Sequence, residues 1–118
     1  MNIEAYRDYC LSKKGVTESF PFDENTLVFK VMGKMFALTN INASTFQVNL
    51  KCDPEQALEL RELHPEIVAG YHMNKKHWNT VAFEESLNDD FLKQLIDSSY
   101  DLVVAKLRKA DKAYLKNL

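Results

Sequence analysis

The chain has 118 residues, of which 46% are hydrophobic and 27% charged, with a formal net charge of −2 and a sequence pI near 5.9. This length fits a single domain over residues 1–118, and such a domain buries roughly two-thirds of its unfolded surface. No apolar run approaches the ~20 residues that span a bilayer. The negative charge excludes a surface that is basic throughout, and leaves a local basic patch as the only electrostatic route to nucleic acid.

The N-terminus and the cysteines indicate a cytoplasmic protein. Residues 1–8 carry acids and aromatics where a signal peptide would have a basic start and a continuous apolar stretch. Cys10 and Cys52 lie far apart without a C-x-x-C pattern, which favours two reduced structural thiols over a zinc site.

The first half of the chain predicts one helix followed by three antiparallel strands. Asn2 is placed to cap a helix that ends at Gly15 and has apolar residues on one face: Ile3, Tyr6, Cys10 and Leu11. Residues 26–32 form the first predicted strand, Gly33-Lys34 a two-residue turn, and residues 35–39 the returning strand. The third strand alternates, with Phe46, Val48 and Leu50 on one face and Thr45, Gln47, Asn49 and Lys51 on the other.

The second half predicts a helix, two strands and a closing helix. Asp53-Pro54-Glu55 begins a helix whose expected buried side is Ala57, Leu58, Leu60 and Leu63, and His64-Pro65 ends it. Residues 67–70 are short and extended, residues 80–83 form the fifth strand, and Asn88 opens one long helix that runs past Leu107. The predicted fold is α+β with two layers, an antiparallel sheet of about five strands covered by helices, in the order α-β-β-β-α-β-β-α.

Residues 70–81 form the most informative segment. Between two predicted strands they gather two aromatics, two lysines, two histidines and two asparagines. Rings beside cations are the residue types that hold planar or anionic partners. The segment therefore favours a binding surface.

Six stretches of the chain, in order, resemble the MmcQ/YjbR family: Phe20-Pro21-Phe22, residues 27–31, residues 33–37, residues 50–55, residues 71–81 and Ser99-Tyr100. The run Lys-x-His-Trp-Asn-Thr-Val at residues 75–81 is the most specific of them. The resemblance implies a DNA-binding role, because the paired hairpins of the family have been compared with a double wing. It also implies a fold akin to frataxin-like proteins and to secretion chaperones. It provides no established catalytic residues.

Weak DNA binding is therefore the leading hypothesis. Lys75, Lys76 and His77 would face phosphates, and Asn74 or Asn79 would bond bases or backbone. Lys30, Lys34 and Lys51 would extend this patch, and Tyr71 or Trp78 could stack on a base. For Tyr71 and Trp78 burial is the expected role, because large rings close to strands normally bury. The lysines from Lys106 to Lys116 are explained by the negative end of a helix.

Two other classes stay open beside DNA binding. A dimeric, chaperone-like module would hold a protein or peptide against its sheet or helices. Iron handling of the frataxin type needs a ridge of carboxylates, and here Arg7 interrupts Glu4 and Asp8. We expect no enzyme, no cofactor and no metal, because His72 and His77 are five residues apart without a third ligand nearby, and three glycines cannot build a phosphate loop.

Overall fold

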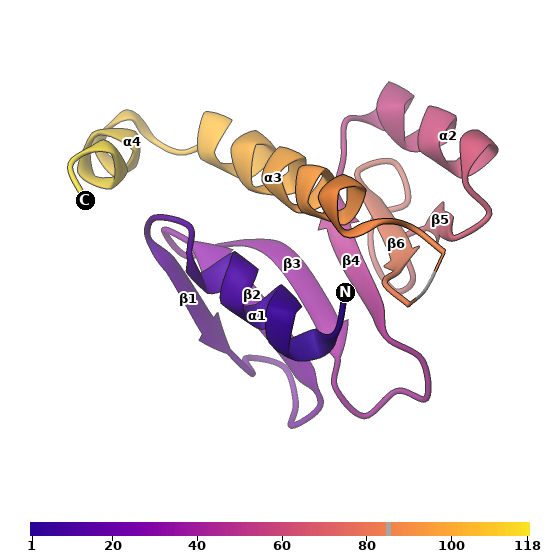
Figure 1. Cartoon of the computed structure of the whole chain (residues 1–118). Coiled ribbons are helices and arrows are strands. Elements are labelled where there is room, and N and C mark those ends of the chain that lie inside the picture. The colour runs from indigo at the N-terminus through magenta and orange to yellow at the C-terminus, as the bar shows by residue number, and fades with distance from the viewer. Residues whose placement is uncertain (85) are drawn as a thin grey trace.

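The computed structural model describes residues 1–84 and 86–118, which form four helices and six strands. In chain order these are α1 (Ile3–Leu11), β1 (Val16–Ser19), β2 (Thr26–Val31), β3 (Lys34–Asn40), β4 (Gln47–Lys51), α2 (Pro54–Leu63), β5 (Ile67–Ala69), β6 (Trp78–Ala82), α3 (Asp89–Ala105) and α4 (Lys109–Lys116) (Figure 1). The predicted α+β fold class is confirmed.

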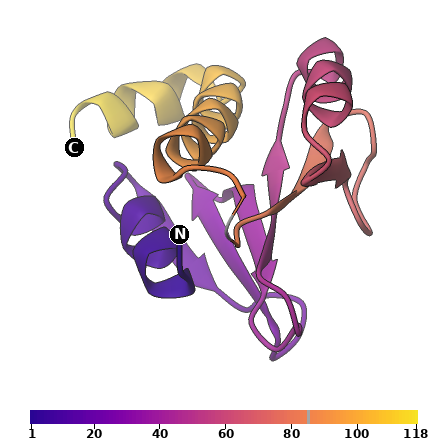
Figure 2. The ribbon, with the colours of Figure 1, turned by 45° about the vertical axis from the view of Figure 1, so that its right-hand side comes forward.

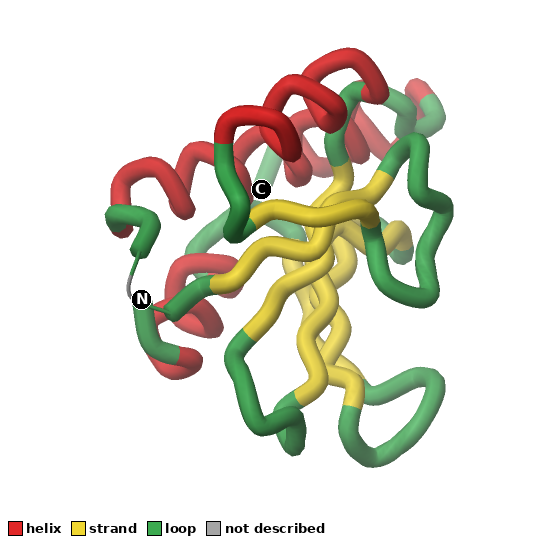
Figure 3. Tube along the Cα trace, turned by 90° about the vertical axis from the view of Figure 1, so that its right-hand side faces the viewer, coloured by secondary structure: helices red, strands yellow, loops and turns green. Residues whose placement is uncertain are grey.

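The strands make one antiparallel sheet in the order β1-β2-β3-β4-β6-β5. Helices α1 and α3 pack on the same face of this sheet, and α2 lies beside β5 at one edge (Figure 2). In Figure 3, loops rather than helices flank the other face. One face of the sheet is therefore covered and the other is open.

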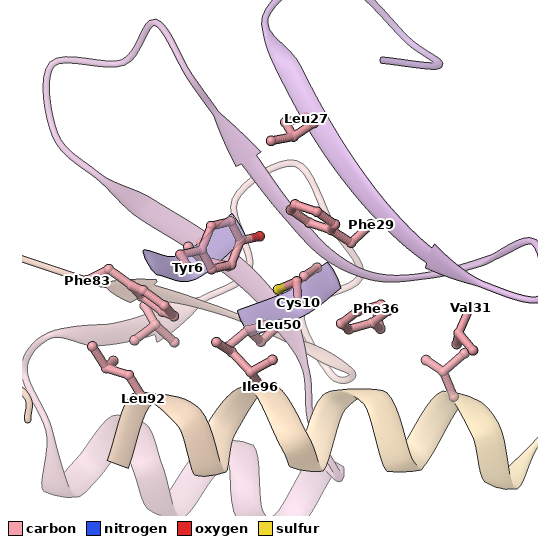
Figure 4. Packing of buried hydrophobic residues seen from close by; sticks show 14 of the residues in the cluster. Tyr6, Cys10, Leu27, Phe29, Val31, Phe36, Leu50, Phe83, Leu92 and Ile96 are labelled. Atoms are coloured by element: carbon pink, nitrogen blue, oxygen red, sulfur yellow. The ribbon is translucent and has the colours of Figure 1, made fainter. Parts of the chain in front are cut away.

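The covered face holds the main hydrophobic core (Figure 4). Tyr6 of α1 is fully buried, and its ring meets those of Phe29 and Phe83 edge to face, with centroids 5.4 and 5.5 Å away. Leu92 and Ile96 of α3 close the cluster from the helix side. Edge-to-face pairs add about 0.5–1.5 kcal/mol each to the area they bury. The side chains of this face thus serve folding.

The predicted helix starts are confirmed. Asn2, Asp53 and Asn88 each accept hydrogen bonds from backbone N–H groups of the first turn of α1, α2 and α3. These bonds satisfy donors that have no partner within the helix.

Two elements differ from the predicted order. Strand β1 was not predicted, because it is a short edge strand whose side chains are exposed or half-buried, so that it shows little apolar alternation. The predicted long C-terminal helix is two helices, since α3 ends at Ala105 and Arg108 is extended (φ −59°, ψ 152°). Buried Leu107 sits at the bend between them.

The first hairpin turn lies one residue earlier than predicted. Its central residues are Met32 and Gly33, with φ of 50° and 80°. Two positive φ angles are what a type I′ turn needs, and this turn matches the twist of the flanking strands. Lys34 consequently begins β3.

The predicted buried side of α2 is wrong at two positions. Leu63 is 71% and Leu58 59% exposed, whereas Ala57 is buried. Helix α2 packs against the short edge strand β5 instead of against the centre of the sheet, so only a narrow stripe of the helix is covered.

Within the described residues, no helix combines the length and the apolar character needed to cross a bilayer. The same part of the chain contains no cluster of three or more His, Cys, Asp or Glu side chains placed to hold a metal ion.

Candidate functional site

The open face of the sheet carries a second, smaller apolar cluster. Val28 alternates with Leu27 and Phe29 along β2 and therefore points away from the main core. It packs with Leu38 and Trp78, and Met35 and Met73 border this cluster. The apolar side chains of the open face are thus partly covered by residues of the β5–β6 connection.

Trp78 anchors this cluster, as the sequence predicted. Its side chain is 7% exposed, so its ring is a packing element rather than a free stacking surface. The Lys51 Nζ atom lies 6.0 Å from the ring centroid, which is at the outer limit of a cation–π contact. The Trp78 ring therefore packs beside the Lys51 side chain.

Three lysines converge around this tryptophan. A hollow of about 250 Å³, called here the lysine hollow, is lined by Lys34, Met35, Lys51, Trp78, Val103 and Lys106. Burial, and secondly the nearby charge of Lys106, lower the pKa of Lys51. An anion placed among Lys34, Lys51 and Lys106 would be stabilised by their charges.

Ser99 fixes the relative positions of these lysines. Its hydroxyl donates to the Phe36 carbonyl at 2.5 Å and accepts from the Lys51 N–H at 2.8 Å, so it joins α3 to β3 and β4. Lys106 caps the C-terminus of α3, about two turns after Ser99, and shares the lysine hollow with Lys51 at the end of β4. In the sequence, Lys106 is explained by the end of a helix alone, and no local pattern predicts this convergence.

Hydrogen bonds from Arg61 of α2 hold the segment between β5 and β6. Its Nε atom donates to Asn79 Oδ1 at 2.7 Å, and its Nη2 atom donates to the carbonyls of Lys75 and Trp78. Asn79 is only 2% exposed. The structure therefore does not place Asn79 on the surface, and its amide serves the interior of the protein.

The other predicted contact residues are spread over this region. Lys75 is exposed and its Nζ donates to the Gly70 carbonyl at 3.0 Å, and the Asn74 side chain accepts from the Lys76 N–H at 2.9 Å. His77 is half-buried, and its carbonyl accepts from the Cys52 N–H. Lys30 lies opposite Met35 in the β2–β3 register. Lys34 and Lys51 share the lysine hollow, and Lys75 and Lys76 lie on the neighbouring loop.

Tyr71 contradicts the expectation of burial, since it is 68% exposed. It borders a larger hollow on the open face, of about 470 Å³, called here the aromatic hollow. His72, Met73 and Thr80, which also line it, belong to the predicted binding segment 70–81, whereas Phe22, Met35, Leu38 and Asn49 were not predicted as site residues. Met35 lines both hollows, so the two adjoin.

Charge is strongly segregated along the chain. Residues 26–52 and 67–83 contain five lysines and no aspartate or glutamate, whereas all 17 acids lie in the remaining segments. The first two segments supply strands β2 to β6 and the connection beside the open face. An acidic protein thus presents a sheet whose only charged side chains from β2 to β6 are basic.

A helix-covered core on one face and an open face on the other define a two-layer α+β sheet domain. The YjbR family model matches residues 11–102, and the chain belongs to this family. The resemblance inferred from the sequence motifs is confirmed.

Relatives of known sequence and structure agree with this assignment. The chain is 33% identical to the uncharacterized protein YjbR of Escherichia coli K12 over the full length of both, and 41% identical to the uncharacterized protein YbdF of E. coli O157:H7 over 78% of this chain and 75% of that protein. The crystal structure of Deinococcus radiodurans protein DR2400 superposes with a TM-score of 0.90, at 41% identity over 98% of this chain and 88% of that one. A Pseudomonas syringae protein gives 0.75 at 30% identity over 86% and 98%.

Proposed function

We propose that this protein binds nucleic acid weakly through the lysine hollow and the adjoining open face of its sheet. The observation that carries the proposal is the convergence of Lys34, Lys51 and Lys106 in one hollow, at the end of the sheet where β3 begins and where β4 and α3 end. Strands β2 to β6 contain no carboxylate. Affinity for nucleic acid comes largely from lysines and arginines that neutralise phosphates and release counterions. Three adjacent lysines can supply such a site even though the protein as a whole is acidic.

The local charge matters more than the net charge. Of the 17 acids, those of α2 and α3 project from helices, and Glu18 of β1 is held by Arg7 through bonds of 2.5 and 2.7 Å. At ~0.1 M salt, charges more than about 10 Å apart are largely screened from each other. Distant acids therefore contribute little to the potential in the lysine hollow, whereas Asp53, two residues after Lys51, lies close enough to oppose it.

The experiment compares two variants with the same loss of charge. In the first, Lys34, Lys51 and Lys106 are changed to glutamine. In the matched control Lys109, Lys112 and Lys116 of α4 are changed instead, because these three lysines do not line the lysine hollow (Figure 1). Fluorescence anisotropy with labelled DNA is recorded as a function of salt.

We expect the log–log salt slope of the first variant to flatten by about two to three, with affinity lost for all sequences alike, because roughly 0.7–0.9 counterions are released per phosphate contact. The control should keep the wild-type slope. Equal losses in both variants contradict the assignment to the lysine hollow. If the wild-type protein shows no salt-sensitive binding at tens of micromolar, within the usual nonspecific range, nucleic-acid binding itself is refuted.

A further inference from the structure

The loop that follows β5 holds an exposed aromatic ring in a fixed place. The ring of Tyr71 lies against that of His72, with centroids 4.1 Å apart and planes tilted by 57°. His72 adopts a positive φ of 60°, which non-glycine residues adopt uncommonly and which clusters at functional sites. This positive φ occurs at His72, where the rings of Tyr71 and His72 both line the aromatic hollow.

Hydrogen bonds fix the backbone beneath Tyr71 on both sides. Its N–H donates to Thr80 Oγ1 at 2.9 Å, and its carbonyl accepts from Asn49 Nδ2 at 3.4 Å. The Thr80 hydroxyl in turn donates to Asn49 Oδ1 at 2.5 Å. Adjacent Gly70 bonds to the Trp78 carbonyl at 2.8 Å. An exposed ring on such a backbone is pre-organised, which lowers the entropy lost when a ligand stacks on it.

The aromatic hollow has the size and lining for a flat ring. Its volume of about 470 Å³ lies in the range of small-ligand sites, and Met35, Leu38 and Met73 provide apolar and polarisable contacts. The amide of Gln47, exposed on β4, also borders it. An apolar wall with polar groups at its edge suits a planar heteroaromatic ring that has donors and acceptors around its rim.

Charge separates the roles of the two adjoining hollows. The described residues of the aromatic hollow include one carboxylate, Asp23, whose pKa is lowered by hydrogen bonds from the backbone N–H groups of Asn25 and Thr26. An ionised carboxylate disfavours phosphate in that hollow. The lysine hollow, across Met35, favours phosphate.

We infer that the aromatic hollow takes an unpaired nucleobase stacked on Tyr71, while a phosphate of the same strand rests among Lys34, Lys51 and Lys106. This inference rests on the proposed function and adds that the ligand is single-stranded. In a duplex the bases are stacked on one another and do not reach a pocket in a protein surface, whereas single strands offer a base to an aromatic platform.

The test uses Tyr71→Ala with a matched control. Tyr114 of α4 is exposed to a similar degree, 61% against 68%, so Tyr114→Ala removes an equivalent ring elsewhere. Tyr71→Phe keeps the ring and removes only the hydroxyl. Anisotropy is measured with one labelled oligonucleotide, with its duplex, and with an abasic strand of the same length, and thermal melts verify folding.

We expect Tyr71→Ala to weaken single-strand binding about tenfold, as stacking on one base is worth roughly 1–3 kcal/mol. Tyr71→Phe and Tyr114→Ala should bind like wild type, and duplex and abasic strands should not distinguish Tyr71→Ala from wild type. Single-strand binding that survives Tyr71→Ala, or an equal loss on duplex, overturns the base site. If the base site is overturned but the glutamine variant of Lys34, Lys51 and Lys106 loses binding, the proposed nucleic-acid binding is still supported.

Discussion

Replacing Arg61 by alanine should destabilise the protein well beyond an ordinary surface substitution. The side chain spans from α2 to the start of β6 and bonds a buried amide oxygen of Asn79 at 2.7 Å. The Nδ2 atom of Asn79 already has no hydrogen-bond partner among the described residues. Without Arg61, both polar atoms of that amide are buried and unsatisfied.

The magnitude follows from the kind of bond that is lost. A hydrogen bond from a charged donor to a buried acceptor contributes about 1.5–3 kcal/mol, whereas the carbonyls of Lys75 and Trp78, at the edge of an exposed loop, can be rehydrated. We expect a loss of about 2–3 kcal/mol in the free energy of unfolding. For a chain of this length that corresponds to a fall of about 10 °C in Tm.

Urea and thermal unfolding followed by circular dichroism measure this loss. Arg108→Ala is the control, because that arginine is 84% exposed and, among the residues that the structure describes, pairs only with Asp111, so its removal should stay within about 0.5 kcal/mol. A double-mutant cycle of Arg61 with Asn79 isolates the pair. A coupling energy near zero, or equal melts for Arg61→Ala and Arg108→Ala, refutes the role of Arg61 as the anchor.

Two further changes test the packing. A Cβ atom at Gly70 would lie 2.8 Å from Trp78 Cβ and 2.9 Å from its carbonyl oxygen, so Gly70→Ala should lose about 1–3 kcal/mol in urea unfolding, and an unchanged midpoint would contradict this crowding. Burial raises the pKa of the Cys10 thiol to about 12, against an opposing effect of Lys13, so the folded state keeps a proton that the unfolded state loses above about pH 9. The free energy of unfolding should therefore fall as pH rises from 9 to 12. Its slope against pH should be steeper in wild type than in Cys10→Ala, by an amount that corresponds to up to one bound proton. Identical slopes in the two proteins would rule out the thiol as the cause.

The sequence predicted those features that depend only on neighbouring residues. The caps at Asn2, Asp53 and Asn88 and the alternation along β4 depend on neighbouring residues, so they are visible in the sequence. Strand β1 escaped prediction because its pairing with β2, not its own composition, makes it a strand. Tertiary pairing often overrides propensity in short edge strands.

The candidate site shows the same division. Lys34 and Lys51 were predicted as members of a basic patch from their places on the hairpin strands, but Lys106 is brought to them only by the docking of α3 through Ser99. Tyr71 and Trp78 looked alike in sequence, yet the first is exposed and the second buried. Which ring faces solvent depends on the path of the loop, and this path is set by Arg61 and Thr80, which lie outside residues 71–78.

The segregation of charge gives this molecule a preferred orientation when it meets a polyanion. The molecule measures 39 × 32 × 26 Å, which is several Debye lengths at ~0.1 M salt, so a chain of phosphates that approaches the lysine hollow is attracted by its three lysines while the more distant carboxylates are screened. At ~0.01 M salt the Debye length grows to about 30 Å, comparable with the molecule itself, and the distant acids then repel the same partner. Diluting the salt should therefore speed the encounter only down to that point, after which the net charge of −2 begins to oppose it.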